Sequence, residues 1–176
     1  MSLILDGSAS VTINSGAILG ITSGTAVAST SGTSIDFTAL PAWVKRITVM
    51  FSGVSTSGTS VPQVQIGSGS VSVANYNSTA SYGSVAGAFA TLTTGFPLSV
   101  SNVATAASVF SGVLVLNLIA SNTWAAQGCN AINTGNISVV IAGVSPGLSG
   151  VLDRVRITTV NGTDTFDAGS INILYE

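Results

Sequence analysis

Four acidic side chains near the C-terminus are the first groups in this sequence that could take part in catalysis. They are Asp153, Asp164, Asp167 and Glu176. Two carboxylates about 5 to 10 Å apart can hydrolyse a glycosidic bond, one as general acid and the other as base or nucleophile. Asp164 and Asp167 also flank a predicted hairpin end, where aspartate commonly accepts hydrogen bonds from nearby backbone. The same residues are therefore candidates for chemistry and for a structural role.

Two arginines favour the structural role. Arg154 and Arg156 stand on the predicted strand just before Asp164 and Asp167, so we expect ion pairs across neighbouring strands. Ion pairing or turn capping is favoured over calcium ligation by these oxygens, and both are favoured over catalysis. We therefore expect a protein that is not an enzyme.

Few other groups are available for nucleophilic chemistry or metal binding. The sequence contains no histidine, and Cys129 is its only cysteine. A zinc site, a Cys–His pair and a disulfide within the chain are therefore not expected. We expect Cys129 to be a small buried thiol and the protein to need no metal or other cofactor.

Aromatic and amide side chains give a better basis for binding a carbohydrate. A ring can stack on the apolar face of a pyranose while amides bond its hydroxyls. Such residues gather in two segments without charge, around 75–84 and 121–130, which we expect to be loops. The candidate ligand-binding residues are Asn75, Tyr76, Asn77, Tyr82 and Trp124. The alternative is that Trp124 fills the core and that the tyrosines pack at a seam between subunits.

The elements that position these residues are predicted from composition. Only ten of the 176 side chains are charged, whereas 47 are Ser or Thr and 20 are Gly. A helical bundle would need more Lys, Glu and Arg for its wet face, and a disordered chain would need fewer apolar residues. The net charge of −2 and the lack of a basic run argue against nucleic acid as a partner.

The apolar stretches of the chain are too short to form a membrane-spanning helix. The longest apolar stretch, 113–120, is far shorter than the roughly 20 residues that a spanning helix needs. The first residues show no basic region followed by a long apolar core, so no secretory signal is expected. We therefore expect no membrane insertion.

Apolar residues alternate with polar ones in most of the chain beyond residue 34, which predicts strands. Ile47, Val49 and Phe51 form one such set, and Val155 and Ile157 form another. The stretches 110–119 and 137–144 are apolar at nearly every position and predict strands covered on both faces. Asn161-Gly162 predicts a type I′ hairpin that joins 155–160 to 163–166. Eight to ten such strands predict an all-β fold, a jelly-roll-like β-sandwich.

Two segments predict that the sandwich contacts other protein chains. Residues 47–152 contain no charged side chain at all, and a single copy would lack the repulsion that keeps surfaces apart. Lys and Pro are also too few to protect many strand edges, so we expect a homo-oligomer, most simply a trimer. Residues 1–34 are rich in Gly and Ser and predict an extended arm that docks on neighbouring chains, ahead of a head domain at 35–176.

Two sequence strings resemble a known family. Residues 33–55 (TSIDFTALPAWVKRITVMFSGVS) resemble the opening of a head-domain family of tailed-bacteriophage tail fibres, and residues 154–176 (RVRITTVNGTDTFDAGSINILYE) resemble its close. Together they cover 46 of 176 residues. The resemblance implies a trimeric virion protein whose middle region carries strain-specific loops that contact the host or a neighbouring protein.

Composition and resemblance together lead to one functional expectation and one main alternative. The first is a virion protein, a tail fibre or receptor-binding head that attaches to a host surface glycan without cleaving it, with residues 1–34 contacting other virion proteins. The alternative is a capsid, head-fibre or neck decoration protein that cements and has no receptor role. A cellular adhesin or ice-binding protein is disfavoured, because regular Thr-x-Thr ranks are absent.

Overall fold

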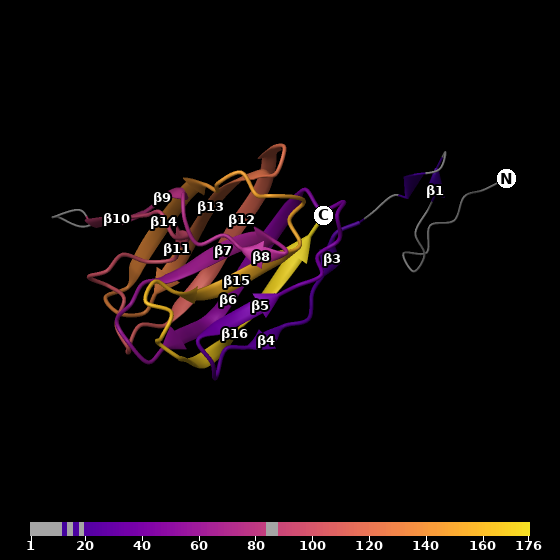
Figure 1. Ribbon diagram of the computed structural model, residues 1–176. Helices are drawn as coiled ribbons and strands as arrows, with labels where there is room; N and C mark the ends of the chain where they lie inside the picture. The colour runs from indigo at the N-terminus through magenta and orange to yellow at the C-terminus, as the bar shows by residue number, and fades with distance from the viewer. Residues whose placement is uncertain (1–11, 14–15, 18–19, 84–87) are drawn as a thin grey trace.

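The structure, a computed structural model, describes residues 12–13, 16–17, 20–83 and 88–176. Within these residues all regular structure is β, which confirms the predicted fold class. Two antiparallel sheets form the two layers seen in Figure 1, and a separate pair of short strands, β1 (Thr12–Ile13) and β2 (Gly16–Ala17), precedes them. No helix in the described part of the chain is long and apolar enough to cross a membrane.

The larger layer, called here the large sheet, is built mainly from the segment without charge. In spatial order its strands are β10 (Ala88–Leu92), β9 (Asn77–Tyr82), β14 (Ile137–Val144), β13 (Thr123–Ile132), β12 (Phe110–Ala120), β6 (Arg46–Thr56) and β16 (Phe166–Tyr175), with β3 (Thr22–Ser23) and β4 (Val27–Ala28) along the free side of β16.

The second layer, the small sheet, combines strands from distant parts of the chain. Its order is β11 (Phe96–Pro97), β7 (Pro62–Ser68), β15 (Arg154–Thr159) and β5 (Ser34–Phe37), and β8 (Ser70–Val71) pairs with β7. The chain crosses between the layers repeatedly, since β5 is followed by β6 in the large sheet and β15 by β16.

The hydrophobic core lies between the two sheets. The largest fully buried side chains are Trp124, Phe96, Phe110 and Phe166, which come from both layers. The predicted alternation is confirmed, because Ile47, Val49 and Phe51 on β6 and Val155 and Ile157 on β15 are all buried. Each such side chain contributes about 1.5–3 kcal/mol through removal of apolar surface from water.

The predicted Asn161-Gly162 hairpin is wrong. β15 and β16 belong to different sheets, so residues 160–165 form a crossover between layers. A type I′ turn needs positive φ at both central residues, and here only Gly162 has it. The Asn161 side chain instead accepts hydrogen bonds from the backbone N–H groups of Thr163 and Asp164. Asn161-Gly162 does lie in a turn, but the turn sequence does not specify in which sheet the next strand lies.

The described end of the predicted arm docks on its own chain. β3 and β4 run antiparallel to β16, and Ser29 is fully buried with its hydroxyl donating to the Ala168 carbonyl over 2.8 Å. Gly24 lies so close to β16 that a Cβ there would sit 2.9 Å from the Ile173 side chain. This segment therefore covers the edge of the large sheet. Most of residues 1–19 lie outside the described residues.

The side of the large sheet that points away from the core is not covered by any of the residues that the structure describes. Its middle consists of two rows of paired residues. The first row is Asn172, Met50, Val113, Cys129, Val140, Ser81 and Phe89. The second is Leu174, Thr48, Val115, Gln127, Ala142, Thr79 and Thr91. These fourteen residues, called here the large-sheet outer face, include no charged side chain.

Two expectations from the sequence fail on this face. The stretches 110–119 and 137–144 were predicted to be covered on both sides, but Val113 and Val140 remain exposed. Cys129 was predicted to be buried and is exposed between them. Both errors have the same cause: apolar side chains, which the sequence predicts to be buried, lie on the solvent-facing side of the sheet in a single copy.

Candidate functional site

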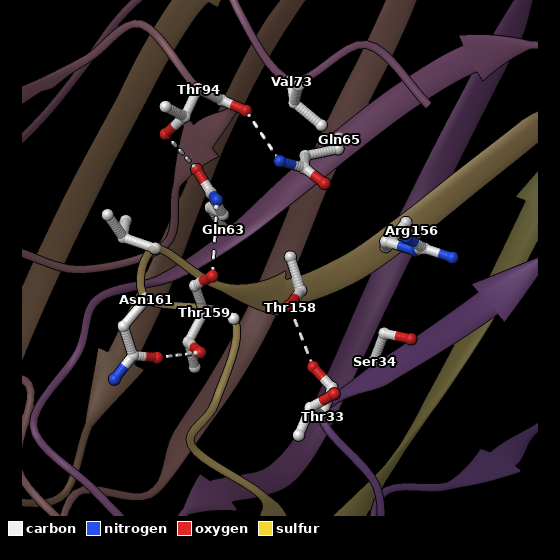
Figure 2. Close-up of a pocket in the computed structure, with 12 residues that line it drawn as sticks. Thr33, Ser34, Gln63, Gln65, Val73, Thr94, Arg156, Thr158, Thr159 and Asn161 are labelled. Carbon is white, nitrogen blue, oxygen red and sulfur yellow. Dashed lines mark hydrogen bonds between the residues drawn. The ribbon is translucent and has the colours of Figure 1, made fainter. Parts of the chain in front are cut away.

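A polar hollow of about 320 Å³ lies over the side of the small sheet that points away from the core (Figure 2). Its floor is formed by Gln63 and Gln65 of β7 and by the β15 residues opposite them in the sheet register, Thr158 and Arg156 respectively. Thr94 and Val73 line one side. Because strand side chains alternate, the same strands point Val64, Ile66, Val155 and Ile157 into the core.

Hydrogen bonds fix the floor of this hollow. The Gln63 amide donates to the Thr159 carbonyl over 3.5 Å and accepts from the Thr94 hydroxyl over 2.8 Å. The Gln65 amide donates to the Thr94 carbonyl over 2.9 Å. Figure 2 shows the carbonyl oxygen of the Gln65 side chain without a dashed contact to the residues drawn. These bonds hold the two amides in fixed orientations, and both residues are nearly buried, with Gln63 2% and Gln65 5% exposed.

One ion pair borders the hollow. The Arg156 guanidinium donates from Nε and Nη2 to the two carboxylate oxygens of Asp36, over 2.6 and 3.1 Å. This bond to Asp36 raises the pKa of Arg156. The two charges neutralise each other, so the hollow as a whole is polar without net charge.

Tyr76 is buried beside this site and supports it. Its hydroxyl accepts from the Ile66 N–H over 2.9 Å and donates to the Ser72 carbonyl over 3.2 Å. Its ring packs edge-on against Phe96, with centroids 5.0 Å apart. Burial raises the pKa of Tyr76 to about 12, against a smaller lowering by the hydrogen bond to Ile66. Tyr76 thus holds segment 72–76 against β7 and places Val73 at the rim.

Trp124 lies in the core of the large sheet, 1% exposed. Its backbone N–H donates to the Ser145 hydroxyl over 3.0 Å, and its indole N–H has no hydrogen-bond partner among the described residues. Trp124 thus fills the core, as the alternative for this residue stated. Tyr76 is buried in the core of its own chain rather than at a seam between subunits, and neither ring is placed where it could stack on a sugar.

The other three predicted ligand-binding residues lie apart from one another. Asn75, with φ of 63°, and Asn77 are exposed on either side of buried Tyr76. Tyr82 is half-buried against the core, and its hydroxyl accepts from the Asn102 amide over 3.1 Å. The two segments predicted as loops are largely strands, β9 and β13, while residue 84 lies outside the described residues. The structure does not assemble the five residues into one site, and sugar binding by Asn75, Asn77 and Tyr82 stays a prediction.

The acidic residues have structural partners. Asp164 accepts from the Ser60 N–H over 3.0 Å and from the Asn161 amide over 2.7 Å, and Asp167 accepts from the Ser55 hydroxyl. Arg156 was predicted to pair with Asp164 or Asp167, and this partner is wrong, because Arg156 forms its ion pair with Asp36. Arg154 pairs with adjacent Asp153.

Glu176, the fourth of these acids, pairs with Arg46 over 2.9 Å at a corner of the large sheet. Among the described residues no three acidic, cysteine or histidine side chains lie together as a metal site would require.

The residues that form the hollow were not predicted from the sequence. A signal was present: two of the three glutamines in the chain, Gln63 and Gln65, alternate with Val64 and Ile66 on one strand. That pattern places both amides on the outer face of a strand. It does not show that Thr94 and residues 158–162 surround them, because these contacts join segments far apart in sequence.

Comparison with protein-family models, curated proteins and solved structures finds no match to this chain. The resemblance to tail-fibre head domains therefore remains a prediction, and function must be argued from the surfaces described above.

Proposed function

We propose that this chain is a virion structural protein, a tail fibre or receptor-binding head that attaches to a bacterial surface glycan without cleaving it. The observation that supports the proposal is the polar hollow over the small sheet. Its polar groups come from side chains that are held in place by hydrogen bonds and carry no net charge. With it we retain the expected jelly-roll-like arrangement, assembly as a homo-oligomer and docking of residues 1–34 on other virion proteins.

The chemistry of the hollow suits a ligand with many hydroxyls. A sugar hydroxyl can donate and accept at once, and the hollow is lined by the amides of Gln63, Gln65 and Asn161 and by hydroxyl side chains such as Ser34. Because these amides are already oriented, a ligand would lose little additional side-chain entropy on the protein side. Val73 and Val160 add small apolar surface at the rim for the C–H face of a ring.

A second function, cementing or decoration of the capsid, head fibre or neck, is favoured by a different observation. The large-sheet outer face has no charge and exposes apolar side chains, as expected of a surface that packs against protein. Cementing needs that face alone, whereas receptor binding also needs the hollow.

The experiment that separates these functions is adsorption. The purified, labelled protein is added to susceptible bacteria, and its saturable binding and its competition with phage are measured. Val73→Trp would fill the hollow from its rim without removing any of its hydrogen bonds. Val151→Trp is the matched control, because Val151 is about as exposed and does not line the hollow.

Receptor binding predicts that the native protein and Val151→Trp adsorb and block infection, while Val73→Trp loses at least about tenfold in affinity. Equal adsorption of both variants would place binding elsewhere. No adsorption by correctly assembled native protein would contradict the receptor role and leave cementing.

A further inference from the structure

The large-sheet outer face forms a continuous surface across seven strands. Val113, Cys129 and Val140 lie side by side on β12, β13 and β14, at its centre. Phe89, 76% exposed on β10, extends the same row beyond Ser81. Leu114 and Ile141, the inward neighbours of Val113 and Val140, are fully buried. The strands thus carry apolar residues on both sides, but only one side is covered by the described part of the chain.

The charge distribution of the molecule makes this face distinct. The nearest charged pair on the face side is Arg46 and Glu176, which neutralise each other at one corner. The opposite surface, over the small sheet, carries the Arg156–Asp36 and Arg154–Asp153 pairs. A charged partner would meet no opposite charge in the two central rows. Its charged groups would lose their hydration without forming ion pairs, so a charged partner is disfavoured. A neutral surface of the same kind is the complementary partner.

The face is large enough for a specific interface. Seven strands span roughly 30 Å at the usual strand spacing, and the outward residues from Ser111 to Asn117 cover about 20 Å along β12. With the flanking rows of Ser111 and Asn117 included, the area is roughly 600 Å² per copy, the lower end of what each partner contributes to a stable interface. The Asn117 row contains Arg46, whose charge is paired with Glu176.

We propose that the large-sheet outer face is covered by the same face of a second copy of this chain. Neutrality makes the face compatible with itself, and the face together with its flanking rows reaches the lower end of stable interface areas. Small side chains such as Ala142, Ser81 and Thr79 leave the surface even enough for close contact between sheets. The inference does not depend on the proposed glycan binding, because it uses the opposite side of the molecule.

Sedimentation of the full chain tests the proposal. The native protein should form an assembly at micromolar concentration. Val140→Lys places a charge at the centre of the face, where burial without a partner should weaken association at least about 100-fold. Thr79→Lys, on the neighbouring strand, is a second variant at an exposed residue, so its effect does not depend on the tolerance of Val140. Val151→Lys is the control on another surface, with 51% exposure against 59% at Val140.

The thiol of Cys129 supplies an independent readout from the same samples. A maleimide should label it slowly in the native assembly and rapidly in Val140→Lys or Thr79→Lys, with the folded state of each variant verified by circular dichroism. A native chain that sediments as a folded monomer would overturn the proposal. An assembly that persists unchanged in both face variants, or equal labelling of Cys129 in native protein and variants, would also overturn it.

Discussion

The outer sides of the two sheets differ although they cover the same core. Over the small sheet, Gln63, Gln65, Thr94 and Thr158 bond one another or nearby backbone, and Arg156 pairs with Asp36. Over the large sheet, the two central rows contain apolar residues, small hydroxyl residues and single amides, without an ion pair. The first surface satisfies its polar groups within one chain. The second leaves apolar groups exposed to water.

This difference indicates that the two surfaces have different roles. A surface whose polar groups are internally bonded can remain in water and still present oriented donors and acceptors to a small ligand. An apolar surface without charge gains free energy only when another surface covers it. The polar side therefore suits recognition, and the neutral side suits assembly.

Two neighbouring residues of β12 test the difference between the core side and the outer side of the large sheet, and the larger effect is expected here. Leu114 is fully buried and Val113 is 41% exposed on the outer face. Leu114→Ala should lower the free energy of unfolding by about 2–5 kcal/mol, because it leaves a cavity. Val113→Ala should cost the single subunit no more than about 0.5 kcal/mol while weakening association. Chemical denaturation and sedimentation of both variants measure the two effects. Equal loss of subunit stability would show that Val113 is not an outer residue.

Tyr76→Phe tests the support of the hollow and should have the next largest effect. The substitution removes the acceptor of the buried Ile66 N–H, which should cost about 1–3 kcal/mol. Denaturant unfolding measures the cost, and Tyr82→Phe is the control because its hydroxyl bonds an exposed amide. If Tyr76→Phe were as stable as the native protein, the anchoring of segment 72–76 by Tyr76 would be wrong.

Alkaline titration examines the same anchor without a substitution. The pKa of Tyr76 in the folded protein is about 12, above its ordinary value of 10.0, because burial disfavours the phenolate. This contribution to stability is complete below pH 10 and is lost as the pH rises from 10 to 12. Stability of the native protein should therefore fall in this window more steeply than that of Tyr76→Phe. Parallel curves would contradict the burial of this hydroxyl.

Asp36→Asn should have a small effect on the polar side. The Arg156–Asp36 pair is partly exposed, so its loss should cost about 0.2–1 kcal/mol and the difference should shrink at high salt. Urea unfolding at low and high ionic strength measures both. A loss of unfolding free energy that is large and independent of salt would mean that a neighbouring molecule buries the pair. The outer side of the small sheet would then also be an interface, contrary to the difference proposed between the two sides.

The effect expected at Asp153 is the smallest. Its hydrogen bonds with Arg154 lower the pKa of this carboxyl, and the Gly69 N–H adds to the lowering. A lowered pKa contributes stability above the ordinary value of 3.8, and this contribution is lost as the pH falls further. Because the group is partly exposed and screened by water, acid unfolding of Asp153→Asn should differ only slightly from that of the native protein. A large difference would contradict the exposed position of this pair.

Local patterns in the sequence predicted many of the strands, but not β9 and β13, which lie in segments predicted to be loops. Alternation at Ile47, Val49 and Phe51, and at Val155 and Ile157, identified the inward side chains correctly, because period two follows from strand geometry alone. The pairing of strands was not predictable in this way. The Asn161-Gly162 turn, for example, connects strands in different sheets, and its sequence does not encode that choice.

The candidate site was less predictable for the same reason. Tyr76 and Trp124 are aromatic residues beside amides, and this local composition is shared by sugar-binding loops and by packed strands. Only tertiary contacts with Phe96 and Ser145 show that both are packing residues. Conversely, the hollow joins Gln63 to Thr94 and Thr159, which are distant in the sequence. The charge-free segment 47–152 predicts assembly, which stays a prediction, and it does not indicate which face would mediate it.

Hydroxyl-radical footprinting of the native protein tests the difference between the two sides most directly. In a single chain, Phe89 and Val113 on the large-sheet outer face and Val73 and Val151 elsewhere are all exposed. At a concentration where the protein assembles, we predict that oxidation of Phe89 and Val113 is strongly suppressed while Val73 and Val151 react as freely as in dilute protein. Unsuppressed oxidation of Phe89 and Val113 in the assembly would contradict the account.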